Sequence, residues 1–392
     1  MPVNIKSIVT ALQKKATAVD STTSSQDIVQ LLKAIKKADG STLAVYDSDG
    51  TLPDAAVSNQ ALGYIRSTGK LKINNGRWDE IGVGTGVPDA NPPTAWLFQG
   101  RITGYTAGGE ESGPNNLNII EKFPLVSAIT TTDVGDLTTT KEWPHGNKSK
   151  HDGFAGTGTN SETTIDKFSF ASDANATVHA TYSAPQLAGF GGFRQHGFST
   201  AQNGYNQHYN PPSSTSVVYK FPFATENSIS TTSITSTATG RSSFSESTST
   251  THGYAAGGYG PTYRTDIEKF QFSTDANYTD VGDLITGAQY SVGISSAEHG
   301  YSVYGSNPSN TNTVQRYSFA SDGDAVSWAT GGTLNEYAHA GISGEYEGFT
   351  AGGYTNSWKT GIHKFPYASE NSLSEDFGDL SSGRRKAAGV QT

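Results

Sequence analysis

Three histidines in this chain stand directly before a glycine and an aromatic residue, in His196-Gly-Phe, His252-Gly-Tyr and His299-Gly-Tyr. Asp152 and Glu347 hold the same place before Gly-Phe. Five such side chains at one repeated position form a set of potential metal ligands. Each one belongs to a separate hairpin turn, however, whereas ligand atoms must converge to about 2 Å from a metal ion. The pattern therefore favours turns, and we predict no metal site.

Two further segments alternate oxygen-bearing side chains as calcium loops do, DANYTD at 275–280 and DANAT at 173–177. Two other copies read ENS, at 226–228 and 370–372, and keep the turn-forming residues without the ligand spacing. Side chains that bond to the backbone of a turn explain all four copies, and calcium explains two. We favour turns and leave calcium as the open alternative.

The sequence contains none of the short motifs that position catalytic groups, neither a G-x-S-x-G elbow, a Walker loop nor H-E-x-x-H. The acidic pair Glu110-Glu111 lies in a polar segment, where a raised carboxyl pKa is hard to arrange. The absence of cysteine excludes thiol nucleophiles, disulfides and Cys-ligated zinc. We expect a protein that is not an enzyme and carries no cofactor.

The charge and composition narrow the possible partners. A net charge of −9 argues against a surface for nucleic acid, whose affinity comes largely from clustered Lys and Arg. No run approaches the roughly 18 apolar residues of a membrane span, and Lys6, Lys14 and Lys15 interrupt the N-terminal apolar stretch, unlike in a secretory signal. We expect a soluble protein without membrane insertion. The 45 glycines fit short strands joined by tight turns.

A repeat organises most of the chain. Six units each open with Gly, an aromatic residue and mostly small residues, and later hold a basic residue beside an aromatic one. The openings lie at Gly104, Gly153, Gly197, Gly253, Gly300 and Gly348. The pairs are Lys122-Phe123, Lys167-Phe168, Lys220-Phe221, Lys269-Phe270, Arg316-Tyr317 and Lys364-Phe365. A period near 48 residues with four short strands is typical of propeller blades. The sequence predicts an all-β, six-bladed propeller of four-stranded blades over residues 94–392.

The end of the chain predicts how the ring closes. Aligned with the preceding units, Gln391-Thr392 falls on Ser295-Ser296, where the fourth strand of a unit ends. The last strand therefore has no successor in sequence, and we expect it to pair with Tyr105–Gly108 of the first unit and remove both exposed edges. Residues 95–99, AWLFQ, could fill the same place and form the alternative.

Residues 1–40 predict two short amphipathic helices. A capping box of Ser24 and Asp27 precedes the second, and Gly40 ends it. Such short helices are marginal in water, so we expect a docking or oligomerisation module, with packing on the chain's own next segment as the equal alternative. The apolar stripes consist of Ile5, Ile8, Val9, Leu12, Ile28, Leu31, Leu32 and Ile35.

Residues 41–93 predict a small β-meander followed by a linker. Leu62–Ile65, Lys70–Ile73 and Trp78–Ile81 read as strands separated by Gly-containing hairpin turns. The stretch GVGTGVPDANPP at 82–93 has the composition of a linker. A domain boundary near residue 93 follows.

The repeats resemble the kelch-like repeats of virion proteins from marine tailed bacteriophages. The pieces that carry the resemblance are GYAAGG at 253–258, DIEKF at 266–270 and DVGDL at 280–284, and the N-terminal 82 residues look like the leading segment of phage tail and fibre proteins. The resemblance implies a kelch-like propeller in the virion and a homo-oligomer attached to other virion proteins of the tail, neck, fibre or capsid vertex.

The loops between the first two strands of each unit are the predicted recognition sites. They differ in length and mix aromatic residues with Asn, Ser and Gly, which suits a host-surface glycan or protein. Packing against neighbouring loops is an equally good explanation of any one residue. The candidates are Tyr205, His208, Tyr209, Tyr259, Tyr263 and Trp358.

Overall fold

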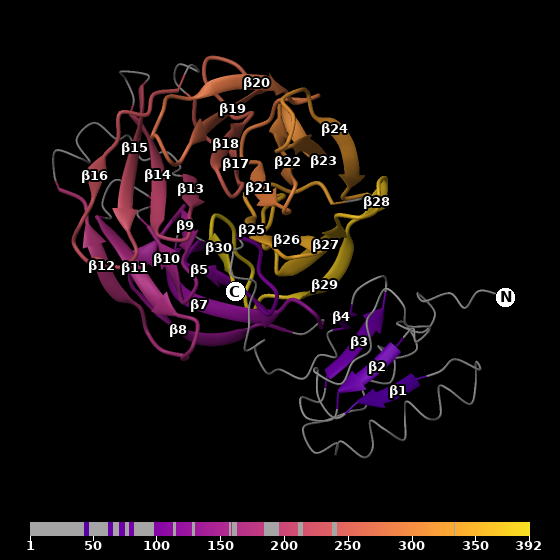
Figure 1. The fold of residues 1–392 in the computed structure, drawn as a ribbon. Helices are drawn as coiled ribbons and strands as arrows, with labels where there is room; N and C mark the ends of the chain where they lie inside the picture. The colour runs from indigo at the N-terminus through magenta and orange to yellow at the C-terminus, as the bar shows by residue number, and fades with distance from the viewer. Residues whose placement is uncertain are drawn as a thin grey trace. The chain divides into compact units, whose positions relative to one another are not determined.

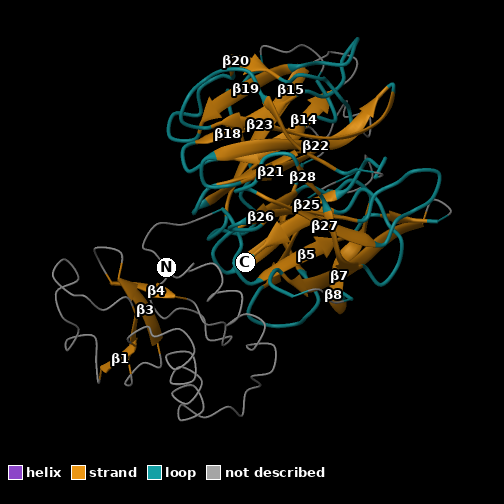
Figure 2. Cartoon of the chain, turned by 90° about the vertical axis from the view of Figure 1, so that its right-hand side faces the viewer, coloured by secondary structure: helices purple, strands orange, loops and turns teal. Residues whose placement is uncertain are grey.

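The computed structural model divides the chain into two compact units, Met1–Thr94 and Ala95–Thr392. It describes residues 98–392 except 113–114, 128–129, 157, 159–162, 184–195, 211–214, 237–240 and 333, and four strands within the first unit. Figure 2 shows these described residues as strands and loops. The predicted helices over residues 1–40, with all eight docking candidates, lie outside the described residues.

The first unit holds a four-stranded sheet in the order β1-β2-β3-β4. The three predicted strands are confirmed as antiparallel neighbours, and β1, which pairs parallel to β2, was not predicted. A parallel partner need not be joined by a short turn, so no hairpin signal marks it in the sequence. The bounds are β1 (Leu43–Tyr46), β2 (Leu62–Ile65), β3 (Lys70–Asn74) and β4 (Trp78–Ile81).

The second unit is a six-bladed β-propeller, as predicted, and Figure 1 shows its blades following one another around a ring. From the axis outward, blade 1 contains β30 (Ala388–Gln391), β5 (Thr103–Ala107), β7 (Asn115–Pro124) and β8 (Thr132–Lys141), with β6 (Glu110–Glu111) beside β7. Blade 2 contains β9 (Gly146–Lys148), β10 (Asp152–Ala155), β11 (Thr164–Ser169) and β12 (Thr177–Thr181). Blade 3 contains β13 (His196–Ser199), β14 (Asn203–Asn210), β15 (Thr215–Pro222) and β16 (Ser230–Thr231).

The second half of the ring repeats this order. Blade 4 contains β17 (Ser245–Thr248), β18 (His252–Ala256), β19 (Asp266–Gln271) and β20 (Thr279–Asp283). Blade 5 contains β21 (Val292–Ser295), β22 (His299–Asn307), β23 (Ser309–Ser318) and β24 (Val326–Thr330), to which β28 (Ser372–Leu373) adds in parallel. Blade 6 contains β25 (Ala340–Ser343), β26 (Glu347–Ala351), β27 (Gly361–Pro366) and β29 (Glu375–Asp379).

The glycine and the aromatic residue that mark each repeat lie opposite each other in adjacent strands. In blade 2, Gly153 pairs with Phe168, and a Cβ built on Gly153 would lie 2.4 Å from the Phe168 ring. The same arrangement joins Gly253 to Phe270 in blade 4. The tip of the aromatic ring therefore occupies the space that a side chain at the glycine would need, which explains why these two residue types recur together.

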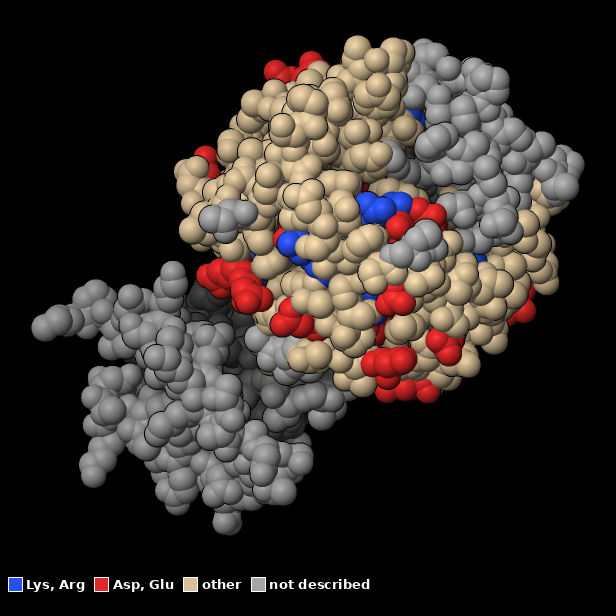
Figure 3. All heavy atoms as spheres, turned by 180° about the vertical axis from the view of Figure 1, so that it is seen from behind, with Lys and Arg blue, Asp and Glu red and all other residues tan. Residues whose placement is uncertain are grey.

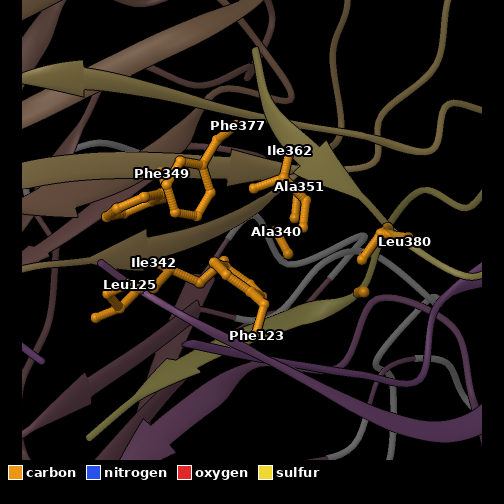
Figure 4. Close-up of a cluster of buried hydrophobic side chains, with 10 residues drawn as sticks. Phe123, Leu125, Ala340, Ile342, Phe349, Ala351, Ile362, Phe377 and Leu380 are labelled. Atoms are coloured by element: carbon orange, nitrogen blue, oxygen red, sulfur yellow. The ribbon is translucent and has the colours of Figure 1, made fainter. Parts of the chain in front are cut away.

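The C-terminal strand closes the ring, which confirms the predicted closure. Val390 of β30 pairs with Tyr105 of β5, and Figure 1 shows the yellow last strand beside the first blade. Residue Gln99 packs on the propeller instead, where its amide donates to the carbonyl oxygens of Ser295 and Ser296. Across the seam, Phe123 of blade 1 meets Phe349 and Phe377 of blade 6 with ring centroids 6.1 and 6.4 Å apart. Figure 4 shows these rings within the apolar cluster of the seam.

The third repeat corrects the predicted alignment. Gly197, taken as the opening of unit three, lies in the inner strand β13, and the opening strand β14 instead holds Gly204, which pairs with Phe221. A Cβ on Gly204 would lie 2.3 Å from the Phe221 ring, as at the other openings. The two Gly-aromatic pairs Gly197-Phe198 and Gly204-Tyr205 stand seven residues apart, and the earlier one imitates the motif.

In blades 1, 2 and 4, a buried ion pair ties the segment before the inner strand to the third strand of the same blade, a link here called the buried joint. In blade 1, Arg384 contacts Glu121 at 2.6 Å, and both side chains are fully buried. In blade 4, Arg241 lies 3.4 Å from Glu268, and burial lowers the pKa of Arg241 to about 10 against the attraction of Glu268. In blade 2 the corresponding residues are Lys141 and Asp166, 3.7 Å apart and fully buried.

Lysines of the basic-aromatic pairs link neighbouring blades. Lys122 bonds to Asp173 of the next blade at 2.6 Å, and the equivalent lysines bond to Glu226, Asp275 and Asp322. Each link lies near the rim, where both partners are partly solvated. The repeated lysine therefore serves blade-to-blade contact.

Candidate ligand-binding face

One end of the propeller, here called the upper face, carries two sets of loops. These are the loops between second and third strands and the loops that lead from an outer strand to the next inner strand, because antiparallel order brings both to the same end. Isolated β-bridges join the two sets within blades 1, 4, 5 and 6. The bridges are Glu110 with Arg385, Ser242 with Tyr259, Gln289 with Ser306 and Tyr337 with Tyr354.

A chain of backbone hydrogen bonds runs around the axis on this face. The amide of Tyr290 donates to Ser243 O at 3.0 Å, Ala338 to Tyr290 O at 3.2 Å, Lys386 to Ala338 O at 2.8 Å and Trp143 to Lys386 O at 3.1 Å. These five residues come from five blades, and their φ angles all lie between 58° and 63°. Left-handed backbone is uncommon for such residues, and its repetition marks a position that the ring of bonds imposes.

Aromatic side chains continue outward from this ring. Trp143 stacks on Tyr290 at 5.6 Å, Tyr290 contacts Tyr337 at 5.3 Å, Tyr337 contacts Tyr354 at 5.7 Å and Tyr354 contacts Trp358 at 5.1 Å between centroids. All five side chains are half-buried. We call these five residues the aromatic strip. It leads from the axis toward the rim of blade 6.

Two basic side chains lie against the strip, and two carboxylates compensate them. The guanidinium of Arg385 lies 4.4 Å from the Tyr354 centroid and donates two hydrogen bonds to Glu110. Lys386 lies 5.0 Å from the Trp143 centroid and pairs with Glu110 at 2.6 Å and with Glu142. Burial raises the pKa of Glu110, but the hydrogen bonds from Arg385 and Lys386 outweigh it, and the net shift is downward. The carboxylate is therefore held ionised.

Figure 3 views the propeller from the side opposite to Figure 1. Lys and Arg side chains are few in this view and lie near the middle of the ring with Asp and Glu nearby, while most of the visible propeller surface is uncharged. A surface of this kind, uncharged except for paired charges, favours a partner that binds through hydrogen bonds over a partner that binds through its net charge.

The structure corrects the predicted positions of Tyr205 and His208. Both lie in strand β14 and not in a loop, and both are buried. The Tyr205 hydroxyl donates to Asp275 at 3.0 Å, and the ring packs at 5.1 Å from Phe272. Burial, with a smaller contribution from His145, holds the pKa of His208 well below its usual value. The prediction placed these residues in a loop because it misaligned the third repeat, whereas they belong to the long strand β14.

The other four candidates lie in the upper half of their blades. Tyr209, described by its backbone alone, also lies in strand β14 and not in a loop, opposite Ser216. Tyr259 and Tyr263 contact each other at 5.3 Å, and Trp358 ends the aromatic strip. Sequence analysis did not find the other strip residues. Two of them, Trp143 and Tyr290, occupy the same place in the repeat, two residues after the lead-in position of the buried joint, and that repetition could have identified them.

The positions considered as metal ligands take part in turns, as predicted. Ser249 accepts a hydrogen bond from the amide of His252, and Ser296 from that of His299, as the turn interpretation requires. His196 instead begins an inner strand and is not equivalent to them. In the DAN segments, Asn175 and Asn277 accept hydrogen bonds from the neighbouring blade. Among the described residues, no group of three or more His, Asp or Glu could hold a metal ion.

A narrow cavity of about 60 Å³ follows the propeller axis. Backbone glycines of five inner strands line it, and Glu246 holds the same position in blade 4. A Cβ on Gly389 would lie 2.0 Å from the Gly341 carbonyl oxygen, so Gly389 has no room for a side chain. Two ionisable side chains, Glu246 and His339, line the cavity, and His339 also pairs with Glu336 at 3.3 Å. Within the described ranges, no helix has the length and apolarity of a membrane span.

Comparison with solved structures supports the same architecture. The chain resembles YjhT with a TM-score of 0.53 and 13% sequence identity, over 64% of this chain and 88% of that one. At this identity the likeness establishes the kelch-like six-bladed propeller fold alone. No protein-family model and no curated protein matches the sequence.

Proposed function

We propose that this chain is a non-enzymatic structural protein of a tailed-phage particle. Its N-terminal unit attaches to the tail, neck or fibre apparatus, and its propeller is displayed. The resemblance of the repeats and of the leading segment to phage virion proteins supports the source. The single observation that carries the displayed role is the upper face, where half-buried aromatic rings and compensated charges lie on a rigid ring.

The charged groups of the upper face are engaged with one another. Arg385 and Lys386 both contact Glu110, whose pKa they lower. A general acid or base at neutral pH needs a pKa near the working pH, so a lowered carboxyl pKa favours binding over proton transfer. The axial cavity adds Glu246 and His339, of which His339 is already bonded to Glu336. These contacts support a binding role.

Attachment is tested by removing residues 1–40 in the infecting phage. Purified particles should then lack the protein when analysed by mass spectrometry, while the propeller expressed with the same deletion keeps its melting temperature. The Lys269→Ala variant, which alters a partly exposed ion pair on the propeller rim, is the matched control and should enter particles normally. Normal incorporation of the deleted chain would contradict the docking role.

A second candidate function is host attachment through the propeller loops. The half-buried aromatic residues of the upper face favour it, because Tyr and Trp dominate many recognition surfaces. The purified full chain, added in excess, should then reduce adsorption of phage to host cells. A cryo-electron-microscopy map in which the upper face is covered by another virion protein would instead support a purely architectural role.

A further inference from the structure

The aromatic strip is a continuous row of rings with a fixed geometry. Four consecutive steps of 5.6, 5.3, 5.7 and 5.1 Å join Trp143 to Trp358. The contributing segments are far apart in the chain and belong to blades 2, 5 and 6. A row assembled in this way requires the closed propeller, because no single blade contains it.

The backbone beneath the strip is held in place on both sides. Trp143 and Tyr290 belong to the ring of left-handed residues around the axis, and Tyr337 and Tyr354 form a β-bridge with each other. The amide of Lys359, next to Trp358, donates to Gly353 O at 3.0 Å. A ligand would therefore meet rings that are ordered before it binds, which lowers the entropic cost of binding.

The polar groups beside the strip supply donors and acceptors without surplus charge. Arg385 lies 4.4 and 5.6 Å from the centroids of Tyr354 and Trp358, and Lys386 lies 5.0 Å from that of Trp143. Glu110 and Glu142 balance these two cations. An anionic ligand would have to compete with carboxylates that already hold both cations, whereas hydroxyl groups can bond to either partner.

We propose that the aromatic strip binds an uncharged polysaccharide along its length. Sugar rings present apolar C–H faces that pack on aromatic rings, and their hydroxyl groups match the donors and acceptors of the Arg385–Glu110 and Lys386–Glu142 pairs. Several rings in a row fit a polymer better than a single sugar. This proposal rests on the recognition role suggested above and names its site and ligand class.

The test uses the full-length protein and a panel of neutral polysaccharides, namely unbranched glucans, mannans and galactans, beside polygalacturonate as an anionic polymer. Affinity electrophoresis measures binding, and a change in tryptophan fluorescence that is lost in the Trp358→Ala variant reports contact at the strip. We expect at least one neutral polymer to retard the protein and polygalacturonate to have no effect. Binding of the anionic polymer alone, or of none of them, overturns the proposal.

Variants locate the site. Tyr354→Ala and Trp358→Ala should each weaken binding about tenfold or more, as expected for aromatic anchors of a binding site. Tyr346→Ala removes a 74% exposed tyrosine from the opposite end of the blades and should bind as the parent does. If an alanine variant melts early, Trp358→Leu and Arg385→Gln replace it. Unchanged polysaccharide binding in folded variants of the strip would show that the strip is not the binding site. The structural role in the particle is tested separately, by incorporation of the protein into particles.

Discussion

Blades 1 and 5 make the same buried joint by different chemistry. In blade 1, Arg384 of the lead-in segment pairs with Glu121 of the third strand, with both side chains fully buried. In blade 5 the two positions hold Ala288 and Gln315, and the Gln315 amide bonds to both the N–H and the carbonyl oxygen of Thr286 at 2.9 Å. In both blades this third-strand residue binds the lead-in segment, through an ion pair in blade 1 and through neutral hydrogen bonds in blade 5.

Blade 6 differs again, because the acidic residue of its lead-in segment pairs within that segment, where Glu336 lies 3.3 Å from His339. Glu336 stands in the lead-in segment and His363 in the third strand. Burial raises the pKa of Glu336, but the hydrogen bond with His339 and the charges of His339 and His363 lower it overall. Comparing variants of the three blades therefore measures two contributions to the free energy of unfolding, the cost of burying a charge and the stabilisation from linking the lead-in segment.

The largest expected effect comes from removing one charge in blade 1. Glu121→Gln leaves the Arg384 guanidinium buried without its counter-charge, which should lower the free energy of unfolding by about 3–5 kcal/mol. The midpoint of urea unfolding measures this loss. Glu345→Gln, which removes the partly exposed partner of Arg101, is the matched control and should change stability by less than about 1 kcal/mol. Equal effects would show that burial does not govern the joint.

Copying the blade 5 residues into blade 1 should reverse most of that loss. The double variant Glu121→Gln with Arg384→Ala buries no charge at this joint and gives blade 1 the Gln and Ala that blade 5 has at these positions. We expect recovery of about 2–3 kcal/mol relative to Glu121→Gln alone, since replacing a whole buried pair is often close to neutral. A double variant that is no more stable than the single one would show that blade 1 depends on its ion pair.

In blade 5, Gln315→Ala should cost about 1–2 kcal/mol. The substitution removes two neutral hydrogen bonds to Thr286 and leaves no charge behind. Unfolding monitored under the same conditions as for blade 1 gives the comparison directly. A loss as large as that of Glu121→Gln would contradict the distinction between charged and neutral joints.

In blade 6 the expected effect depends on pH. Because the pKa of Glu336 is lowered below its usual 4.5, its stabilising contribution is present above that value and is lost as the pH falls through the folded-state pKa. Glu336→Gln should therefore be less stable than the parent at pH 7, by about 1 kcal/mol, and the difference should shrink below pH 4.5. A difference that stays constant down to pH 3 would exclude the carboxylate as its source.

The smallest effect is expected at the rim. Lys269→Ala removes the link to Asp322 of the next blade, whose carboxylate is 56% exposed. The loss should be about 0.2–1 kcal/mol and should decrease further in 0.5 M salt. Melting curves at two salt concentrations test it. A loss comparable to that of the buried joints would show that the rim links are desolvated.

The repeat made the propeller predictable, because each blade must satisfy the same packing. Gly153 beneath Phe168 and the closing strand ending at Gln391 both follow from the repeated pattern. The binding face was less predictable. Tyr205 read as a loop residue because Gly197-Phe198 imitates an opening, and the aromatic strip joins residues such as Trp143 and Tyr290 that are far apart in the chain. The repeated position marks Trp143 and Tyr290 separately, but nothing local in the sequence shows that the two rings meet across the axis.

Each blade takes its inner strand from the preceding sequence repeat. The repeat in the sequence and the blade in the structure are therefore offset by one strand. A duplication of one repeat beginning at any equivalent codon would insert a complete blade between two existing ones. The seam between β30 and β5 would keep its residues. This one-strand offset should let recombination change the number of blades without requiring a new closing strand.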